Sequence, residues 1–178
     1  RTPDSFFDRG ATYAEDAAFD RVVEAVGHGA EIVDIGGVRA GYGPEVDTEE
    51  EIERVASFVS RVREAYPDLA ISVDTWRSGV AKQACAAGAH LINDTWGGSD
   101  PGLAEVAAEF GAGLVCSHTG GATPRTRPFR VNYGTSERGV VDDVIAEVTA
   151  AAERAVAAGV ARDTVLIDPT HDFGKNTY

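Results

Sequence analysis

Cysteine, long apolar runs and positive charge are all scarce in this sequence. It has only two cysteines, Cys85 and Cys116, among 178 residues. Two cysteines without metal-ligand spacing exclude a disulfide-rich scaffold and are typical of buried thiols in a reducing cytoplasm. No apolar run approaches the roughly 20 residues that span a bilayer, and no signal peptide opens the chain. A membrane-spanning protein is therefore not expected.

The charge balance excludes two further classes of partner. Lysine and arginine number 16 against 29 acidic residues, which gives a formal net charge of −13. Nucleic acids and anionic membrane surfaces are polyanions, so an acidic chain is not expected to bind either of them. The hydrophobic share of 43% and the charged share of 25% are ordinary for a globular domain with a buried core. We expect a cytoplasmic globular protein.

Five apolar runs each end in polar residues or glycine. They are EIVDIGG (31–37), AISVDTW (70–76), LINDTWGG (91–98), GLVCSHTGG (113–121) and VLIDPTHDFGK (165–175). Helical patterns lie between them, and Thr48 with Glu51 forms a capping-box pattern at the start of one helix. Glycines that precede most of the runs suit residues that end helices. Apolar strands alternating with helices predict an α/β fold with a parallel sheet.

The polar strand ends favour a closed barrel over an open sheet. Asp34, Asp74, Asn93, His118 and Asp168 follow five different apolar strands. One such residue is explained by capping, but five in series favour a single site at the carboxyl ends of the strands. An open sheet uses one or two strand ends, and no GxGxxG or Walker loop follows the first strand. The prediction is a (β/α)8 TIM barrel.

The predicted barrel is incomplete. A (β/α)8 barrel typically needs about 250 residues, whereas this chain has 178 residues and about five recognisable strands. We predict parallel strands at about 31–35, 70–74, 91–94, 113–117 and 164–168. A partial barrel leaves long unpaired edges, which proteins rarely tolerate. The sequence is therefore expected to be part of a longer protein.

Several motifs, taken together, resemble those of dihydropteroate synthase. They are TPDSFFDRG (2–10), VDIGG (33–37), SVDTWRSGVAKQACAAGAHLINDTWGG (72–98), DP (100–101), and IDP and FGK within 167–175. The resemblance covers essentially the whole chain in the same order. It implies a TIM-barrel transferase of folate biosynthesis that joins 6-hydroxymethyl-7,8-dihydropterin pyrophosphate to p-aminobenzoate and releases pyrophosphate. Residues 1–178 would be one pterin-binding domain that continues beyond both ends.

The resemblance implies that three polar residues bind the pterin, namely Asp74, Asn93 and Asp168. Their chemistry fits this role independently. The amino-pyrimidinone edge of a pterin presents adjacent N–H donors, which a carboxylate accepts in bidentate fashion. An asparagine supplies both a donor and an acceptor for the remaining ring atoms.

Other roles are implied by the resemblance alone. Asp4 and Phe6 of the first loop would be catalytic, and Ser5 and Phe173 would lie on the p-aminobenzoate side. Mg²⁺ would be the cofactor, with its protein ligand before Arg1, and a homodimer is expected. The four histidines have no metal-ligand spacing, so no metal ligand is predicted within this chain.

The second loop departs from the family pattern. It reads GGVRAGYG at 36–43, where the family is close to GGESTRPG. Val38 replaces the glutamate, Ala40 the threonine and Gly41 the arginine, which leaves Arg39 out of register as the candidate pyrophosphate ligand. Each lost charge-assisted hydrogen bond is worth roughly 1.5–3 kcal/mol.

A second departure lies at the last strand end, where Thr170 and Asp172 stand at positions usually occupied by glycine. Both departures resemble a divergent synthase-like paralogue of actinobacteria. Three functions therefore remain: an active synthase, which we favour from sequence because Asp74, Asn93 and Asp168 are all present, a catalytically impaired paralogue that binds pterin, and a pterin-dependent methyltransferase. The methyltransferase lacks support from the TPDSF motif.

The segment 119–139 is basic in an otherwise acidic chain. It contains one acid, Glu137, and four arginines, Arg125, Arg127, Arg130 and Arg138. Because it follows a strand, it is expected on the active-site face, where it could hold an anionic substrate group. The simpler interpretation, a solvated loop or an interface contact, is the one we favour from sequence.

Overall fold

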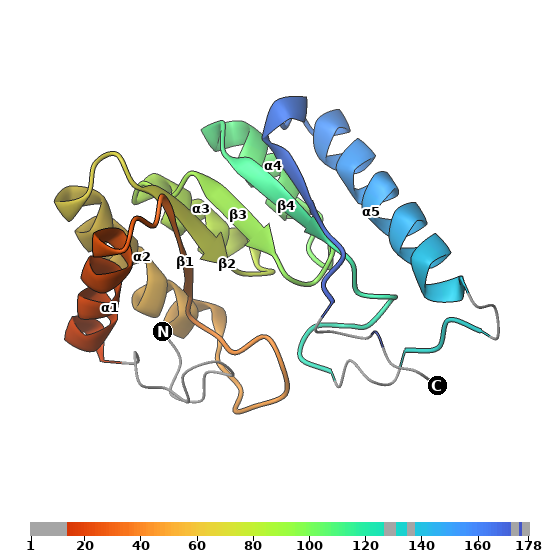
Figure 1. Cartoon of the computed structure of the whole chain (residues 1–178), viewed down its shortest axis with the longest axis horizontal. Helices are drawn as coiled ribbons and strands as arrows, with labels where there is room; N and C mark the ends of the chain where they lie inside the picture. Colours follow the sequence, from red (N-terminus) through yellow and green to blue (C-terminus); the bar gives the residue numbers. More distant parts are fainter. Residues whose placement is uncertain (1–13, 127–130, 135–137, 172–174, 176–178) are drawn as a thin grey trace.

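The structure is a computed structural model that describes residues 14–126, 131–134, 138–171 and 175 (Figure 1). Its strands form one sheet in the order β1-β2-β3-β4-β5. They are β1 (Ile32–Gly36), β2 (Ala70–Asp74), β3 (Leu91–Asp94), β4 (Gly113–Ser117) and β5 (Val165–Asp168). Every neighbouring pair is parallel, which confirms the predicted strands to within one residue. The arrangement is that of five successive units of a (β/α)8 barrel.

A helix precedes β1, and helices connect each strand to the next. They are α1 (Glu15–Gly27), α2 (Thr48–Ala65), α3 (Ser78–Ala86), α4 (Gly102–Phe110), α5 (Gly139–Ala157) and the short 3₁₀ helix η2 (Arg162–Thr164). α2 packs on β1 and β2, α4 on β3 and β4, and α5 on β4 and β5. The main core lies between these helices and the sheet, where Ile71, Val73 and Ile92 are completely buried. In the described part of the chain, none of the helices is long and apolar enough to cross a membrane.

Local sequence signals explain where the helices end. Gly111 closes α4 with φ +63°, and Gly159 follows α5 with φ +107°. Both lie in the left-handed region that glycine enters without a steric penalty. The predicted capping box is wrong by one residue, because Asp47 is the N-cap of α2 and accepts a hydrogen bond of 2.8 Å from the backbone N–H of Glu50. The Glu51 side chain is directed into the protein instead.

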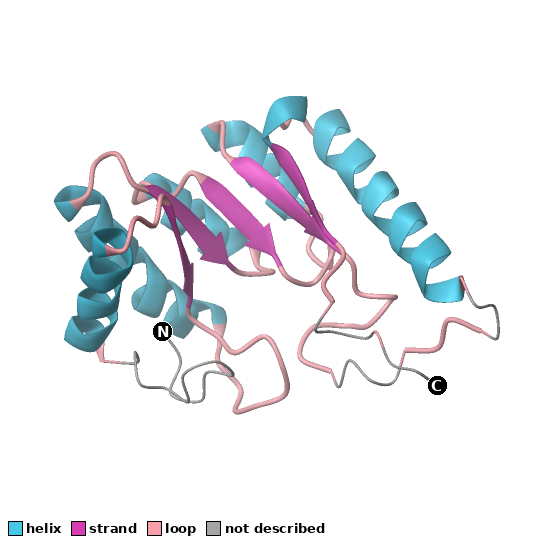
Figure 2. Cartoon of the chain, viewed as in Figure 1, coloured by secondary structure: helices cyan, strands magenta, loops and turns pink. Residues whose placement is uncertain are grey.

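The alternation of strand side chains separates the core from the functional face. Val73 and Ile92 face the helices, so the adjacent Asp74 and Asn93 face the opposite side of the sheet. Strand register aligns Asp74 with Asn93 and Ser117 with Asp168. The connections after β1 and β4 lie at this same edge of the sheet (Figure 2).

Candidate functional site

A cavity of about 320 Å³ lies at the carboxyl ends of the strands. Its lining comprises Ala40, Asp74, Asn93, Thr95, Ser117, Asp168, Thr170 and His171. The three residues assigned to the pterin by resemblance come from β2, β3 and β5, and the fold brings all three to this one cavity. Parallel strands place their carboxyl ends together, so the convergence follows from the topology.

The carboxyl group of Asp74 has a raised pKa in this cavity. Thr95 donates its hydroxyl to the Asp74 carboxylate. Burial and, to a smaller extent, the neighbouring carboxylate of Asp34 together raise the pKa of Asp74 to about 7. A carboxylate that titrates near neutral pH is a common feature of functional sites. Asp74 therefore changes between a hydrogen-bond donor and a double acceptor within the physiological pH range.

Asp34 supports the site from the middle of its strand. It pairs in register with Ser72, so it is not at the strand end that the sequence suggested. Ser72 donates its hydroxyl to Asp34 at 2.5 Å, and the Asn93 Nδ2 donates to the other Asp34 oxygen at 3.2 Å. With one N–H held by Asp34, the Asn93 amide keeps its oxygen and a second N–H for a ligand.

Asp168 is held by the turn that follows β5. The backbone N–H of Thr170 donates to its carboxylate at 2.7 Å. Thr170 has φ +52°, which is strained for a β-branched residue and costs about 1–2 kcal/mol. The position that usually carries glycine thus keeps a glycine-like backbone but adds a side chain to the cavity wall. Lys175 donates to the Thr170 carbonyl at 2.9 Å.

The altered second loop contributes one small side chain to the described wall of the cavity. Ala40 lines the cavity, whereas Arg39, the residue assigned to the pyrophosphate, is not among the lining residues. Val38, at the family's glutamate position, is buried with 5% exposure.

A buried ion pair, missed by sequence reasoning, anchors this loop. Glu51 is completely buried; it accepts from the Thr75 hydroxyl at 2.7 Å and from Arg77 at 2.5 Å. Arg77 also donates to the Val46 carbonyl at 2.8 Å, at the end of the loop. Glu51 was assigned to a helix cap from local spacing, and only its long-range partners reveal its role.

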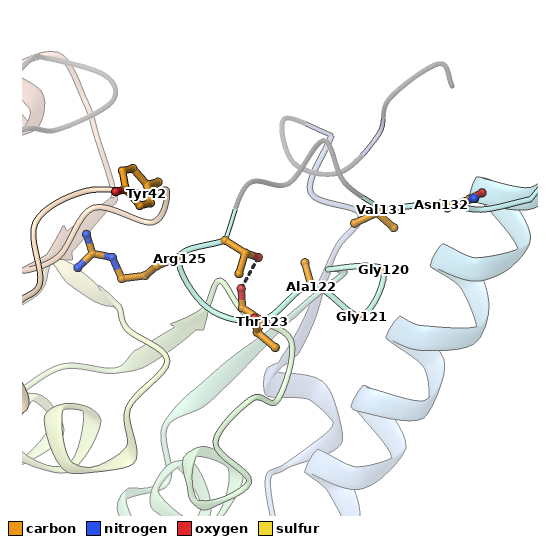
Figure 3. Close-up of a pocket in the computed structure, with 9 residues that line it drawn as sticks. Tyr42, Gly120, Gly121, Ala122, Thr123, Arg125, Val131 and Asn132 are labelled. Carbon is orange, nitrogen blue, oxygen red and sulfur yellow. Dashed lines mark hydrogen bonds between the residues drawn. The ribbon is translucent and has the colours of Figure 1, made fainter.

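A second cavity of about 900 Å³ is lined by the loops that follow β1 and β4. Tyr42 from the loop after β1 lines it together with residues 120–123, 125–126 and 131–132 of the basic segment. Figure 3 shows Arg125 extending from the basic segment toward the loop that carries Tyr42. The Arg125 Nε donates to the Gly41 carbonyl at 3.4 Å. Arg138 instead lies at the start of α5 and pairs with Asp142 at 3.6 Å.

His118 does not join the other strand-end residues, which corrects the sequence-based expectation. It is completely buried; its Nε2 lies 2.8 Å from Asp143 and 3.2 Å from Glu147 on α5. The ligand atoms of these three residues lie within 4.8 Å of one another. Glu147 also accepts the backbone N–H of Thr119 at 3.0 Å and that of Gly120 at 2.9 Å. This network ties α5 to the loop after β4, and the i, i+4 acids were its only sequence signal.

Several predicted residues lie outside the described part of the chain. They are Asp4, Ser5 and Phe6 of the first loop, Asp172 and Phe173 after β5, and Arg127 and Arg130 of the basic segment. Their roles stay predictions.

This chain is similar in sequence and in fold to known proteins. The chain matches the family described as pterin binding enzyme over residues 1–178, and it belongs to that family. A Mycobacterium tuberculosis protein named inactive dihydropteroate synthase 2 is 70% identical over 178 residues, which are 100% of this chain and 56% of that protein.

Two solved dihydropteroate synthases share the fold. The Yersinia pestis enzyme in a sulfonamide drug complex has a TM-score of 0.87 at 34% identity, over 98% of this chain and 61% of that one. The Burkholderia cenocepacia enzyme complexed with 7,8-dihydropteroate has a TM-score of 0.79 at 34% identity, over 92% of this chain and 56% of that one. The chain thus spans between half and two thirds of these relatives' length.

Proposed function

We propose that the protein containing this chain binds a reduced pterin in the 320 Å³ cavity and is a dihydropteroate synthase-like transferase with impaired condensation. The observation that carries the proposal is the convergence of Asp74, Asn93 and Asp168 on that cavity. The Burkholderia cenocepacia relative, whose structure holds 7,8-dihydropteroate, supports a pterin ligand.

The cavity residues match the hydrogen-bonding edge of a pterin. An ionised Asp74 or Asp168 accepts the paired N–H donors of the amino-pyrimidinone ring. Asn93 offers a donor and an acceptor to the ring atoms that remain. Because Asp34, Thr95 and the backbone of Thr170 already hold these three side chains, binding needs little reorganisation.

The altered second loop is the basis for impaired condensation. The family pattern places a hydroxyl and a guanidinium beside the pyrophosphate, where they donate hydrogen bonds. Ala40 has no hydroxyl and Gly41 has no guanidinium, so neither hydrogen bond can form. Each missing charge-assisted hydrogen bond weakens stabilisation of the leaving group by roughly 1.5–3 kcal/mol. The relative that is 70% identical to this chain is named inactive, in agreement with this reasoning.

Full synthase activity is the second candidate, because the three pterin-reading residues are all present. In that reaction the p-aminobenzoate nitrogen attacks the pterin methylene carbon and loses a proton, and the C–O bond breaks as pyrophosphate leaves with the electron pair. The protein must position both substrates and stabilise the developing charge. This candidate includes catalytic roles for Asp4 and Phe6. It also places Ser5 and Phe173 beside p-aminobenzoate.

Magnesium fits such a site through oxygen ligands. The Asp74 and Asp168 carboxylates are engaged by Thr95 and by the Thr170 backbone, so we assign them to the ring rather than to a metal. Mg²⁺ would be held by the phosphate oxygens of the ligand and by the residue that the resemblance places before Arg1, where it would neutralise the tail. A homodimer in the cytoplasm is also part of the proposal.

The test is a pterin titration of the full-length protein beside a turnover assay with both substrates. We expect micromolar binding of a reduced pterin or tighter, and turnover far below that of an active synthase run in parallel. Asp168→Ala should abolish pterin binding, because it removes a charged acceptor from the ring donors. Asp163→Ala, which removes an exposed carboxylate just before β5, is the matched control and should bind normally.

Each other outcome identifies a different function. Turnover equal to the active synthase would establish the second candidate. Methyl transfer from a methylated reduced pterin would indicate the methyltransferase. No pterin binding, or unchanged affinity in Asp168→Ala, would refute the pterin assignment and leave Asp168 as a turn residue.

A further inference from the structure

We propose that His118, Asp143 and Glu147 bind one divalent transition-metal ion at a site outside the strand-end cavity. None of the three is among the described residues that line that cavity. The ion would be held by three side chains of this chain, and its remaining positions would be filled by water. The site is separate from the Mg²⁺ that the phosphate oxygens of a ligand would hold, and it does not depend on pterin binding.

The three side chains meet between β4 and α5, which pack against each other (Figure 1). His118 directly follows β4, and the two acids stand at positions i and i+4 of α5. Residues at this spacing lie on the same face of a helix. One ligand atom from each of the three residues lies within 4.8 Å of the other two. Two elements thus bring an imidazole nitrogen and two carboxylate oxygens together, although the histidines have no ligand spacing along the sequence.

A single proton serves this arrangement poorly. The His118 Nε2 lies 2.8 Å from the Asp143 Oδ2 and 3.2 Å from the Glu147 Oε2. A neutral imidazole has one N–H, so a proton on Nε2 would be shared between two carboxylates. A divalent ion bonds to all three atoms and offsets the charge of both acids.

The distances suit such an ion with a small adjustment. Two ligand atoms of a tetrahedral zinc ion lie about 3.3 Å apart, close to the separation of 3.2 Å between the His118 Nε2 and the Glu147 Oε2. Asp143 is nearer to Nε2 than this, but its side chain is 48% exposed and has room to move outward. The same exposure gives an ion access from solvent.

Hydrogen bonds already orient the Glu147 carboxylate. Its Oε1 accepts the backbone N–H of Thr119 at 3.0 Å and the Thr119 hydroxyl at 2.9 Å. Its Oε2 accepts the backbone N–H of Gly120 at 2.9 Å, which leaves a second lone pair on the oxygen that faces His118. Carboxylates that ligate metals are commonly held in this way.

The histidine can present its lone pair at little cost. His118 is completely buried, which fixes its ring. Its Nδ1 has no hydrogen-bond partner among the described residues. Moving the imidazole proton from Nε2 to Nδ1 therefore breaks no hydrogen bond at Nδ1, and the metal replaces the hydrogen bond lost at Nε2.

A buried hydroxyl without a partner points to a ligand at the same place. The Tyr133 Oη is buried and has no hydrogen-bond partner among the described residues. The Tyr133 ring stacks on His118 with centroids 5.9 Å apart. Burial raises the pKa of Tyr133 to about 12, and the nearby carboxylates of Asp143 and Glu147 contribute to the increase. Buried polar atoms normally have a partner, and a water bound to the metal would accept this hydroxyl proton.

The ligand atoms identify the class of ion. One imidazole nitrogen with two carboxylate oxygens suits first-row transition ions such as Zn²⁺ and Co²⁺. Mg²⁺ and Ca²⁺ take oxygen ligands instead. Zn²⁺ is therefore the probe for affinity, and Co²⁺ is the probe for coordination because its visible absorption depends on its ligands.

The experiment is a calorimetric titration of the chelator-treated, full-length protein with Zn²⁺ at pH 7.5 without phosphate. We expect saturable binding of one ion that depends on the acids of α5, with micromolar affinity or tighter. Asp143→Asn should weaken it roughly 10- to 100-fold. Asp142→Asn is the matched control, because it makes the same charge change one residue away, where the side chain pairs with Arg138 at 3.6 Å. This control should bind Zn²⁺ normally.

A second variant tests the nitrogen ligand. His118→Gln should change the visible absorption of the Co²⁺-loaded protein, because an imidazole ligand is lost. Circular dichroism checks that the variant is folded, since His118 is buried. The Asp143→Asn comparison does not share this difficulty, because Asp143 is half-exposed.

Three results would overturn the proposal. One is the absence of saturable Zn²⁺ binding by the unmodified protein. Another is equal affinity in Asp143→Asn and Asp142→Asn, which would assign the ion to other groups or to general charge. The third is a Co²⁺ spectrum that a folded His118→Gln variant leaves unchanged. Each of these results would leave the proposed pterin site standing, because that site uses other residues.

Discussion

Pterin affinity should depend on pH through Asp74. Burial and the nearby Asp34 raise the pKa of Asp74 to about 7. A carboxylate accepts the paired N–H donors of the ring only when it is ionised, so the competent fraction is about 0.09 at pH 6 and about 0.91 at pH 8. Because the apparent dissociation constant scales inversely with that fraction, affinity should rise about tenfold between these pH values.

The assay is a fluorescence or calorimetric titration with 6-hydroxymethyl-7,8-dihydropterin from pH 5.5 to 8.5. Asp74→Asn should weaken binding at pH 8, since the amide turns an N–H toward a ligand N–H, and should flatten the pH profile. His171 also lines the cavity, so its contribution is tested separately. A His171→Gln variant should still show the increase in pterin affinity with pH that Asp74 causes.

Two results would refute the reasoning. Affinity that is constant across this range would mean that Asp74 does not carry the ring donors or does not titrate there. Affinity that increases on acidification would mean that the ligand prefers a protonated Asp74 as a donor. In either case the N–H donors of the ring would have to be reassigned to Asp168 or Asn93.

The remaining predictions concern stability, measured by denaturant unfolding. The pKa of Asp74 is raised from 3.8 to about 7 in the folded protein, so the contribution of Asp74 to stability is lost as pH rises between these values. Asp74→Asn should remove this dependence of the unfolding free energy on pH and should stabilise the protein at pH 8 by up to about 4 kcal/mol. Glu51→Ala should cost about 3–5 kcal/mol, because it breaks a buried pair with Arg77. Gly37→Ala should cost about 1–3 kcal/mol, because its Cβ would lie 2.8 Å from the Val55 Cγ2. The Thr170→Gly variant should have an unfolding free energy about 1 kcal/mol higher than that of the Thr170→Ala variant, because only glycine relieves the positive φ. Equal values for the two variants would mean that the backbone at position 170 is not strained.

Much of the fold could be read from the sequence, because its signals are local. Apolar runs and helical periodicity located all five strands to within one residue, and the glycine at 111 ended α4 as expected. The parallel order followed from the alternation of strands and helices. Once the strands were parallel, the convergence of Asp74, Asn93 and Asp168 followed as well, since each stands at or near a carboxyl end.

Only the tertiary structure decided how the other polar residues are used. His118 follows a strand as Asp168 does, yet its ring turns to acids on α5, 25 and 29 positions later. Glu51 fits a helix cap by spacing, yet its partner is Arg77, 26 positions away. Arg125 reaches Gly41 across 84 positions. Local patterns fix backbone conformation, whereas the partner of a buried charge is whichever group packing brings within hydrogen-bonding distance, because leaving that charge unpaired costs several kcal/mol.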